Sequence, residues 1–335
     1  MSESLRIATF NLESLDDRPD LEVPLSARIR ILRPQLQRLE ADVLCLQEVN
    51  GQHPPGGGER RLLALDRLLA ETPYAGYHRA VSPRVAGPEE DAAAASHGVD
   101  AVHNLVILSR FEIERSEALH HRLVLPPLYR SMTARPPERE PRPVVWDRPI
   151  LHAILELPGG RRLHVVNLHL RAPLAAPIAG QKHDALRWKS ISGWAEGFYI
   201  ATMKRAGQAL ETRLLVERIF DAEPDALIAV CGDFNAEARQ TPLRTIRGDA
   251  GDTGNPSLEA RALVPLERAV PDARRFSVVH GGRPEMLDHM LVSRPLFRCC
   301  EAVAVHNEDL ADELIDTGPQ SHHAPLVASF DLDGA

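Results

Sequence analysis

The stretch "LIAVCGDFNAEA", residues 227–238, decides how the rest of the chain is interpreted. Its apolar run, Leu227–Cys231, predicts a buried strand that stops abruptly at Gly232. Asp233 and Asn235 then follow two residues apart, so they lie on one face at the edge of a core. Taken alone, the stretch is equally compatible with a simple Asx-type turn. The residues at the ends of the other predicted strands decide between a simple turn and a functional site.

Further segments rich in Val, Ile, Leu or Phe predict strands along the whole chain. They lie at residues 5–12, 42–49, 103–110, 150–157, 162–170, 226–234, 286–293, 301–307 and 325–332, with a hairpin signal in "LPGGRR" (157–162). Amphipathic helices are predicted at 26–40, where Pro34 should kink or end the helix, at 59–71 and at 204–221. This mixture predicts an α/β fold with partly antiparallel sheets and helices packed outside them.

Three segments predict long loops: 81–100, 130–145 and 171–205. The last includes "DALRWKSISGWAEGFYIATMKRAGQ" (184–208), which concentrates aromatic residues in a chain with only 4% of them. These aromatics suit either stacking on a base or acyl chain, or packing a helix onto a sheet. Because no persuasive linker or repeat interrupts the pattern, residues 1–335 are expected to form a single domain with elaborated loops.

Composition excludes several classes of protein. The 335 residues are 44% hydrophobic and 26% charged, with a net charge of −8, which argues against a basic surface for general DNA binding but leaves room for a local basic groove. No apolar run is long enough for a transmembrane helix, and the N-terminus lacks a secretion signal. Buried free thiols are the simplest interpretation of the four cysteines. A cytoplasmic location without an evident protein partner is therefore expected.

Polar residues recur at the ends of the predicted strands. They are Asn11 and Glu13, Gln47 and Glu48, Asn167, His169 and Arg171, Asp233 and Asn235, Asp288, and His322 and His323. Individually each has an ordinary explanation, such as a core histidine at His169 or an exposed pair at His322 and His323. Together they match the needs of metal-assisted hydrolysis, in which oxygen ligands hold a hard divalent cation and His or Asp handles protons.

The ordered set "TFNLES … LCLQEV … VILSR … VVNLHL … CGDFNAE … MLDHMLVS … SHHAPLV" resembles the endonuclease/exonuclease/phosphatase superfamily, which includes DNase I-like nucleases. "GDFN" and "NLHL" are moderately specific, and the set covers residues 5–330. The resemblance implies a four-layer α/β sandwich, in which two packed mixed β-sheets are flanked by helices. It also implies hydrolysis of a phosphate ester with Mg²⁺ or Mn²⁺.

The resemblance assigns a role to each matching position. Glu48 corresponds to the principal metal ligand, with Asn11 and Glu13 nearby. Asn104 is expected beside the substrate phosphate, and His169 is expected to hydrogen-bond a phosphate oxygen. Asp233 would orient or deprotonate water, Asn235 would steady the phosphate, and Asp288 would orient His323, which contacts phosphate. From its position beyond His169 we expect Arg171 either to bind phosphate bidentately or to be solvated.

One departure concerns the metal. The family usually has Ser-Asp-His where this chain has Ser321, His322 and His323. Because an imidazole suits Mn²⁺ or Zn²⁺ better than Mg²⁺, His322 predicts an altered metal preference or a single metal site.

Fold does not fix the substrate. The expected function is a divalent-metal-dependent phosphodiester hydrolase, specifically an intracellular nuclease that attacks phosphorus in line with an activated water. The alternatives are a phosphatase or phosphodiesterase acting on a small phosphorylated metabolite or lipid head group, and a non-catalytic binding protein. The Arg-rich loop (Arg130, Arg135, Arg139, Arg142, Arg148) suits a phosphate-binding rim or a solvated surface.

Overall fold

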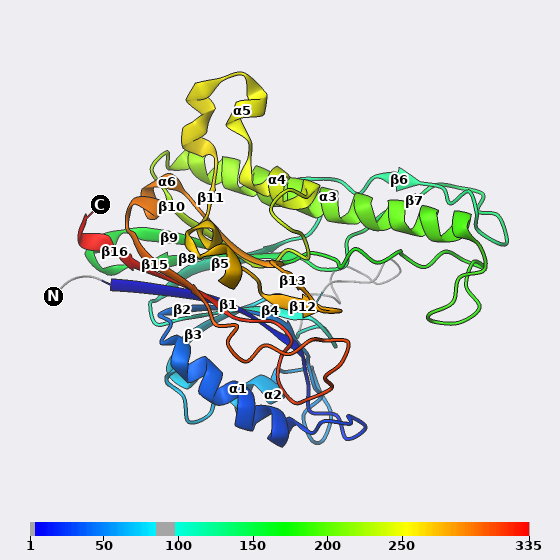
Figure 1. Ribbon diagram of the computed structural model, residues 1–335, viewed down its shortest axis with the longest axis horizontal. Helices are drawn as coiled ribbons and strands as arrows, with labels where there is room; N and C mark the ends of the chain where they lie inside the picture. The colour runs from blue at the N-terminus through cyan, green and yellow to red at the C-terminus, as the bar shows by residue number, and fades with distance from the viewer. Residues whose placement is uncertain (1–3, 85–97, 335) are drawn as a thin grey trace.

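Two six-stranded sheets pack face to face in the computed structural model, which describes residues 4–84 and 98–334 (Figure 1). The first sheet has the order β15-β16-β1-β2-β4-β3. Its strands are β1 (Ser4–Leu15), β2 (Val43–Val49), β3 (His78–Val81), β4 (Asn104–Ser109), β15 (Cys300–Val305) and β16 (Leu326–Asp331).

The second sheet has the order β11-β14-β10-β9-β8-β5. Its strands are β5 (Ile113–Leu119), β8 (Ile150–Glu156), β9 (Arg162–His169), β10 (Leu227–Asp233), β11 (Val264–Pro265) and β14 (Asp288–Val292). Two small hairpins complete the strands: β6 (Leu128–Tyr129) with β7 (Arg142–Pro143), and β12 (Val278–His280) with β13 (Arg283–Glu285).

Helices cover the outer faces, so the predicted four-layer sandwich is confirmed. Figure 1 shows α1 (Leu25–Leu39) and α2 (Leu63–Leu69) below the first sheet, and α3 (Ile191–Ala222) with α4 (Thr241–Arg247) above the second. Two shorter helices are α5 (Ala250–Thr253) and α6 (Arg294–Arg298). Three clusters of buried apolar side chains fill the spaces between these four layers.

The predicted elements are largely found, with three corrections. Helix α1 runs through Pro34, because this residue lies on the exposed side, where a helix tolerates a tilted carbonyl. Helix α3 begins at Ile191, so the expected loop 171–205 ends early; Ser190 caps the helix by accepting a hydrogen bond from the Gly193 N–H at 2.9 Å. Strands β3 and β5 were not predicted, and neither were the short strands β6, β7, β11, β12 and β13. The expected loop 81–100 lies mostly outside the described residues.

The inner faces of four strands change character along their length. β1 and β2 run parallel, as do β9 and β10, so their carboxyl ends gather at one edge of the sandwich. Moving towards that edge, apolar side chains of the inter-sheet core give way to polar ones: Ile7 to Asn11 in β1, Cys45 to Gln47 in β2, Val165 to His169 in β9, and Cys231 to Asp233 in β10.

Asn167 joins the two sheets directly beneath these polar ends. Its Oδ1 accepts a hydrogen bond from Nε2 of Gln47 at 2.7 Å, and its Nδ2 donates to the carbonyls of Leu46 and Val106 at 3.0 and 2.9 Å. All three partners belong to the first sheet, whereas Asn167 belongs to the second. This bridge fixes the spacing between the sheets where the polar side chains meet.

No helix in the described part of the chain is both long enough and apolar enough to cross a membrane.

Candidate active site

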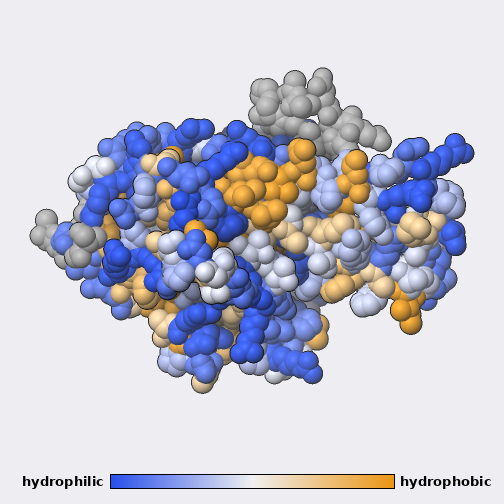
Figure 2. Space-filling view, turned by 90° about the horizontal axis from the view of Figure 1, so that it is seen from above, coloured by the Kyte–Doolittle hydropathy of each residue, from blue (hydrophilic) through white to orange (hydrophobic). Residues whose placement is uncertain are grey.

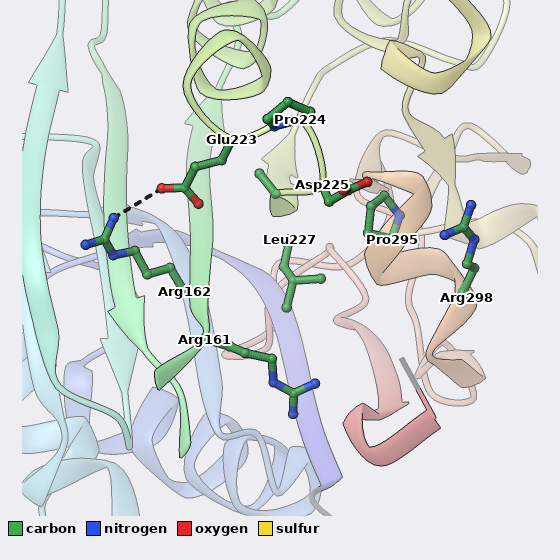
Figure 3. Close-up of a pocket in the computed structure, with 9 residues that line it drawn as sticks. Arg161, Arg162, Glu223, Pro224, Asp225, Leu227, Pro295 and Arg298 are labelled. Carbon is green, nitrogen blue, oxygen red and sulfur yellow. Dashed lines mark hydrogen bonds and ion pairs between the residues drawn. The ribbon is translucent and has the colours of Figure 1, made fainter. Parts of the chain in front are cut away.

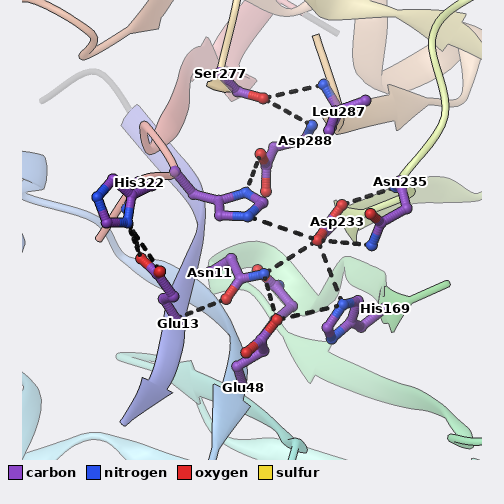
Figure 4. Close-up of polar contacts among 12 residues, drawn as sticks. Asn11, Glu13, Glu48, His169, Asp233, Asn235, Ser277, Leu287, Asp288 and His322 are labelled. Carbon is purple, nitrogen blue, oxygen red and sulfur yellow. Dashed lines mark hydrogen bonds and ion pairs between the residues drawn. The ribbon is translucent and has the colours of Figure 1, made fainter. Parts of the chain in front are cut away.

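Asp233 lies at the centre of the polar cluster at the carboxyl ends of the strands (Figure 4). Its Oδ1 accepts a hydrogen bond from the Asn235 N–H at 2.7 Å, so the expected Asx turn is present. Its Oδ2 faces the cluster and accepts hydrogen bonds from Nδ2 of Asn11 at 3.1 Å and Nδ2 of Asn235 at 3.0 Å. Residues 227–238 thus form a strand end and a turn that also places a buried carboxylate in the cluster.

Gly232 permits this delivery. Its φ of 141° is disfavoured for other residues, and a Cβ there would lie 1.9 Å from the carbonyl oxygen of Leu168. β10 therefore approaches β9 closely at the last pair before Asp233.

Glu48 enters the cluster from β2 through an irregular strand end. The pairing of β2 shifts register between Leu46 and Val49, and Glu48 itself has a φ of 57°. Its Oε2 accepts hydrogen bonds from the backbone N–H and the hydroxyl of Ser14, each at 3.0 Å, and its Oε1 accepts one from Asn11 at 3.2 Å. A bulge thus aims this carboxylate at the neighbouring sheet.

His323 and Asp288 form a buried pair above Asp233. Nδ1 of His323 lies 2.8 Å from Oδ2 of Asp288, and its Nε2 lies 4.0 Å from Oδ2 of Asp233. The hydroxyl of Ser277 accepts hydrogen bonds from the backbone N–H groups of Leu287 and Asp288, both at 3.0 Å (Figure 4). These contacts fix the start of β14, and with it the direction of the Asp288 carboxylate.

His169 faces two carboxylates at once. Its Nε2 lies 3.4 Å from Oδ2 of Asp233 and 3.6 Å from Oε1 of Glu48. Burial lowers the pKa of His169 well below its usual value, and the positive charge of Arg148 lowers it further. His169 is therefore neutral, so its Nε2 either donates a proton to the carboxylates or, in the other tautomer, offers a lone pair to a cation.

The cluster contains two further residues: His103, which sequence reasoning missed, and Arg148, which it named only within an arginine-rich loop that suits a phosphate-binding rim or a solvated surface. Nδ1 of His103 lies 3.6 Å from Oε2 of Glu48 and accepts a hydrogen bond from Nη2 of Arg148 at 3.2 Å. The charge of Arg148 acts on Glu48 and Asp233. His103 stands directly before a predicted strand and Arg148 ends the arginine-rich loop, but neither sequence pattern distinguishes these residues from solvated ones.

The charges of the cluster shift the pKa values of its members in different directions. Burial raises the pKa of Asp233 to about 7, and the adjacent Asp288 carboxylate adds to the effect. Burial opposes the charged form of His323, but the Asp288 carboxylate outweighs it and raises the pKa of His323 to about 10. Burial likewise acts against ionised Glu48, yet His103 and the Asn11 hydrogen bond outweigh it and lower the pKa of Glu48.

Asn104 and Arg171, both expected to contact phosphate, form their polar contacts outside the cluster. Asn104 donates from Nδ2 to the carbonyls of Val49 and Asp100 at 2.8 and 2.9 Å, and its Oδ1 accepts the Asp100 N–H at 2.8 Å. Its carboxamide therefore holds a loop, which argues against the expected phosphate contact. Arg171 lies beyond the end of β9 and its Nη1 is 2.5 Å from Oδ2 of Asp147; Arg148, in contrast, reaches the cluster.

Glu13 and His322 pair with each other on the far side of β1 from Asp233 (Figure 4). The Glu13 carboxylate lies 2.9 Å from Nδ1 of His322 and accepts its backbone N–H at 2.7 Å. The expectation that both residues join Glu48 at a metal is therefore wrong in this geometry. Asn11 already uses one lone pair of its Oδ1 to accept the Glu13 N–H at 2.8 Å.

Two groups of potential metal ligands remain within the described residues. One contains Glu48, His103 and His169, and the other contains Asp233, Asp288 and His323. The first combines one carboxylate with two imidazoles, a donor set that suits Mn²⁺ or Zn²⁺ better than Mg²⁺. In the second group Asp288 keeps His323 charged, so this ring offers no lone pair to a cation. The pKa values of His103 and His169 are both lowered, so the first group has neutral imidazoles and fits a cation better.

The aromatic residues of 184–208 lie away from the sheets. Trp194, Phe198 and Tyr199 are 45%, 41% and 52% exposed on α3. Figure 1 shows that this amino-terminal half of α3 projects beyond the sheets beside β6 and β7. Of the two alternatives for these residues, packing of the helix onto a sheet is wrong, because the sheet ends before it reaches them.

The model of the endonuclease/exonuclease/phosphatase family matches residues 8–310. The chain belongs to this family. Among solved structures, this family member is similar to truncated TDP2 from Caenorhabditis elegans, with 16% identity, a TM-score of 0.57, and 98% of this chain and 97% of that chain covered. It is also similar to an endonuclease/exonuclease/phosphatase from Beutenbergia cavernae, with 16% identity, a TM-score of 0.54 and coverages of 98% and 72%.

A third similar structure is the human nocturnin catalytic domain with a bound sulfate anion, at 17% identity and a TM-score of 0.51, with coverages of 98% and 95%. No curated protein matches the sequence. At these identities the structural likeness concerns the fold, and the family membership supports phosphoester hydrolysis as the general activity.

Proposed function

We propose that this chain is a divalent-cation-dependent phosphodiesterase that cleaves nucleic acid strands. The observation that carries the proposal is the position of Asp233. Its carboxylate has a pKa raised to about 7 and lies between the N–H donors of Asn11 and Asn235 on one side and protonated His323 on the other. A base with a pKa near neutrality beside a fixed cation is suited to attack by water on an anionic ester.

The residues divide the reaction between them. Asp233 takes the proton of the attacking water, while Asn235 and Asn11 hold the carboxylate in place. The water oxygen forms a bond to phosphorus, the bond to the leaving oxygen breaks, and that oxygen takes up a proton from solvent water. His323, kept charged by Asp288, donates to a phosphate oxygen where negative charge grows. Arg148 adds a second positive charge on the His103 side.

Glu48, with His103 and His169, would hold the cation, and a cation there supplies Lewis-acid stabilisation of the phosphate. Glu48 stays ionised because its pKa is lowered, and a cation beside it would add positive charge where an anionic substrate binds.

A polymer is favoured over a small ester because hollows flank the cluster on two sides. One, of about 480 Å³, is lined by His103, Arg148 and Lys204. The other, of about 320 Å³, is lined by Arg205 and Arg239. Since Lys204 and Arg205 are adjacent on α3, the two hollows open on either side of the same helix turn, which suits a strand that continues past the reacting phosphate.

The test is nicking of supercoiled plasmid in Mg²⁺ and, separately, in Mn²⁺. We expect wild-type protein to nick the plasmid and Asp233→Asn to lose about 10³-fold in rate, because the isosteric amide accepts no proton. Asp225→Asn is the matched control, since Asp225 is an exposed carboxylate near the opposite ends of the strands. Full activity of Asp233→Asn would refute the assigned base, and full activity in excess EDTA would refute the cation.

A further inference from the structure

Arg205 is a buried cation with unused hydrogen-bonding capacity. It is 6% exposed, and its Nη2 donates to the carbonyl oxygen of Asn235 at 2.8 Å. Its Nη1 is buried without a hydrogen-bond partner, and no carboxylate forms an ion pair with it among the described residues. Asp233 is the carboxylate whose charge acts on it. A buried guanidinium in this state favours an anionic partner, because unpaired burial of a charge is costly.

Arg205 lines the groove of about 320 Å³ between α3 and the start of α4. Pro173, Phe198 and Pro242 contribute apolar walls, and Arg239 stands at the exposed side. Arg239 forms no ion pair with any residue in the described ranges. The groove therefore combines two available cations with flat apolar surface, directly behind the Asn235 backbone.

Phe198 extends the groove into a stacking surface. It stacks on Trp194, one helical turn away, with ring centroids 5.6 Å apart and planes inclined by 23°. Both rings remain two-fifths exposed or more. Figure 2, which looks onto the α3 side of the molecule, shows apolar surface gathered in patches along this face. Exposed stacked aromatics beside arginines are the combination that binds single-stranded nucleic acid.

We infer that the groove between α3 and α4 binds a nucleotide of the substrate strand next to the cleaved phosphate. Arg205 and Arg239 contact its phosphate, and its base stacks on Phe198. The inference rests on the proposed function, because the nucleotide belongs to the strand that Asp233 helps to cleave.

A lipid surface fits the same aromatics less well. A helix that lies on an anionic membrane carries a row of basic residues on its polar face. Between Ile191 and Arg205, α3 has only two basic residues, Lys204 and Arg205. Lys204 pairs with Asp147 at 2.6 Å, and Arg205 is reached only from within the groove, so neither presents its charge to a flat lipid surface.

The experiment compares two substrates in Phe198→Ala and Arg239→Gln. Single-stranded oligothymidylate can occupy the groove, whereas bis(p-nitrophenyl) phosphate has neither base nor second phosphate. For the oligonucleotide we expect KM to rise about 10-fold in Phe198→Ala with kcat little changed, since stacking on one aromatic ring is lost. Arg239→Gln should raise KM and reduce the slope of log KM against log salt by about 0.7, the value for one phosphate contact on a single strand.

Tyr199→Ala is the matched control, because Tyr199 is an equally exposed neighbour that contacts Tyr129 and does not line the groove. If the inference holds, Phe198→Ala raises KM for the oligonucleotide at least five times more than it raises KM for bis(p-nitrophenyl) phosphate. It also raises KM for the oligonucleotide at least five times more than Tyr199→Ala does. Equal effects would overturn it while leaving a hydrolase that acts on the small ester.

Wild-type protein that hydrolyses neither substrate would refute the proposed function, and the groove is then tested by binding. Quenching of tryptophan fluorescence by oligothymidylate, weakened about 10-fold in Phe198→Ala, would still support the nucleotide site. Absence of quenching would overturn it. Phe198-dependent binding to phosphatidylglycerol vesicles without binding to the oligonucleotide would overturn it in favour of a membrane surface.

Discussion

The amino and carboxyl ends of β9 and β10 differ in the size of the adjacent hollows and in their buried charges, and this difference indicates where the active site lies. At their amino ends lies a hollow of about 700 Å³, lined by Arg161, Arg162, Glu223, Asp225 and Arg298 among others (Figure 3). At their carboxyl ends, Asp233 and His169 meet side chains of the opposite sheet, and the flanking hollows are smaller. The larger space does not coincide with the buried charges.

The two ends differ in how their charged side chains are paired and exposed. Arg162 lies 3.0 Å from Glu114 and 3.2 Å from Glu223, at half-exposed positions where water screens the charges. At the carboxyl ends, Asp233 and Asp288 are about 1% exposed, and their repulsion adds to burial in shifting the Asp233 pKa. Unbalanced buried charge is therefore the better guide to the site than cavity volume.

The largest expected effect comes from removing a charge at the carboxyl end. Asp288→Asn should lower kcat for phosphodiester cleavage by about 10³-fold, because His323 loses the carboxylate that orients and charges its ring. Glu223→Gln is the control at the amino end, with an expected change below about twofold. A loss in Glu223→Gln as large as that in Asp288→Asn would mean that the two ends are not functionally distinct.

A second prediction concerns stability just beneath the site. Asn167→Leu should reduce the free energy of unfolding by about 2–4 kcal/mol, because it removes three buried hydrogen bonds that join the two sheets. Denaturant unfolding measures this. In a double-mutant cycle with Gln47→Leu, the two changes should be strongly non-additive. Additive losses would show that the Gln47–Asn167 bridge does not couple the sheets.

Sequence periodicity predicted most of the layers because the inner faces of the long strands carry a strong apolar signal. Strand β5 was missed since its burial is slight and its residues, "IERSEAL", are mostly charged or polar. Helix α3 was predicted too short because Gly193 and Gly197 weaken its amino-terminal half. Gly197 is needed there, since a Cβ would lie 2.3 Å from the carbonyl oxygen of Ala176.

The site was predictable where polar residues end strands and unpredictable where side chains arrive from loops. Asp233, Glu48 and His169 follow from strand ends that converge. Arg148 and Arg171 carry the same charge near strand ends, and only the fold decides that Arg148 reaches Glu48 while Arg171 pairs with Asp147. His322 illustrates a second limit: its neighbour His323 enters the cluster, whereas the backbone directs His322 to Glu13.

A third prediction concerns the pH dependence of stability at a pair of histidines away from the cluster, on β8 and β9. Nε2 of His152 on β8 lies 3.1 Å from Nδ1 of His164 on β9, and burial with the His164 charge lowers the pKa of His152 to about 4. The charged groups around this pair are Glu117 and Arg115 on β5, Glu114, Arg162 and Glu223.

As pH falls, His152 of the unfolded chain takes up a proton near its ordinary pKa of 6.5, whereas His152 of the folded chain does so only near pH 4. Stability from this residue is therefore full above pH 6.5 and is lost as pH falls towards 4, by on the order of 1–2 kcal/mol at pH 5. His152→Gln should flatten the fall in unfolding free energy between pH 7 and 5. An unchanged slope would show that His152 is not held neutral in the folded protein.

The smallest effect is expected at the rim of the large hollow. Arg298 is exposed and forms no ion pair with the described residues. Arg298→Gln should therefore change kcat/KM by less than about twofold and the free energy of unfolding by less than about 0.5 kcal/mol, as for most surface positions. Plasmid nicking and denaturant unfolding of the same preparation measure both. A tenfold rise in KM would instead place part of the substrate in the large hollow. The amino ends of β9 and β10 would then bind substrate, while their carboxyl ends carry out the reaction.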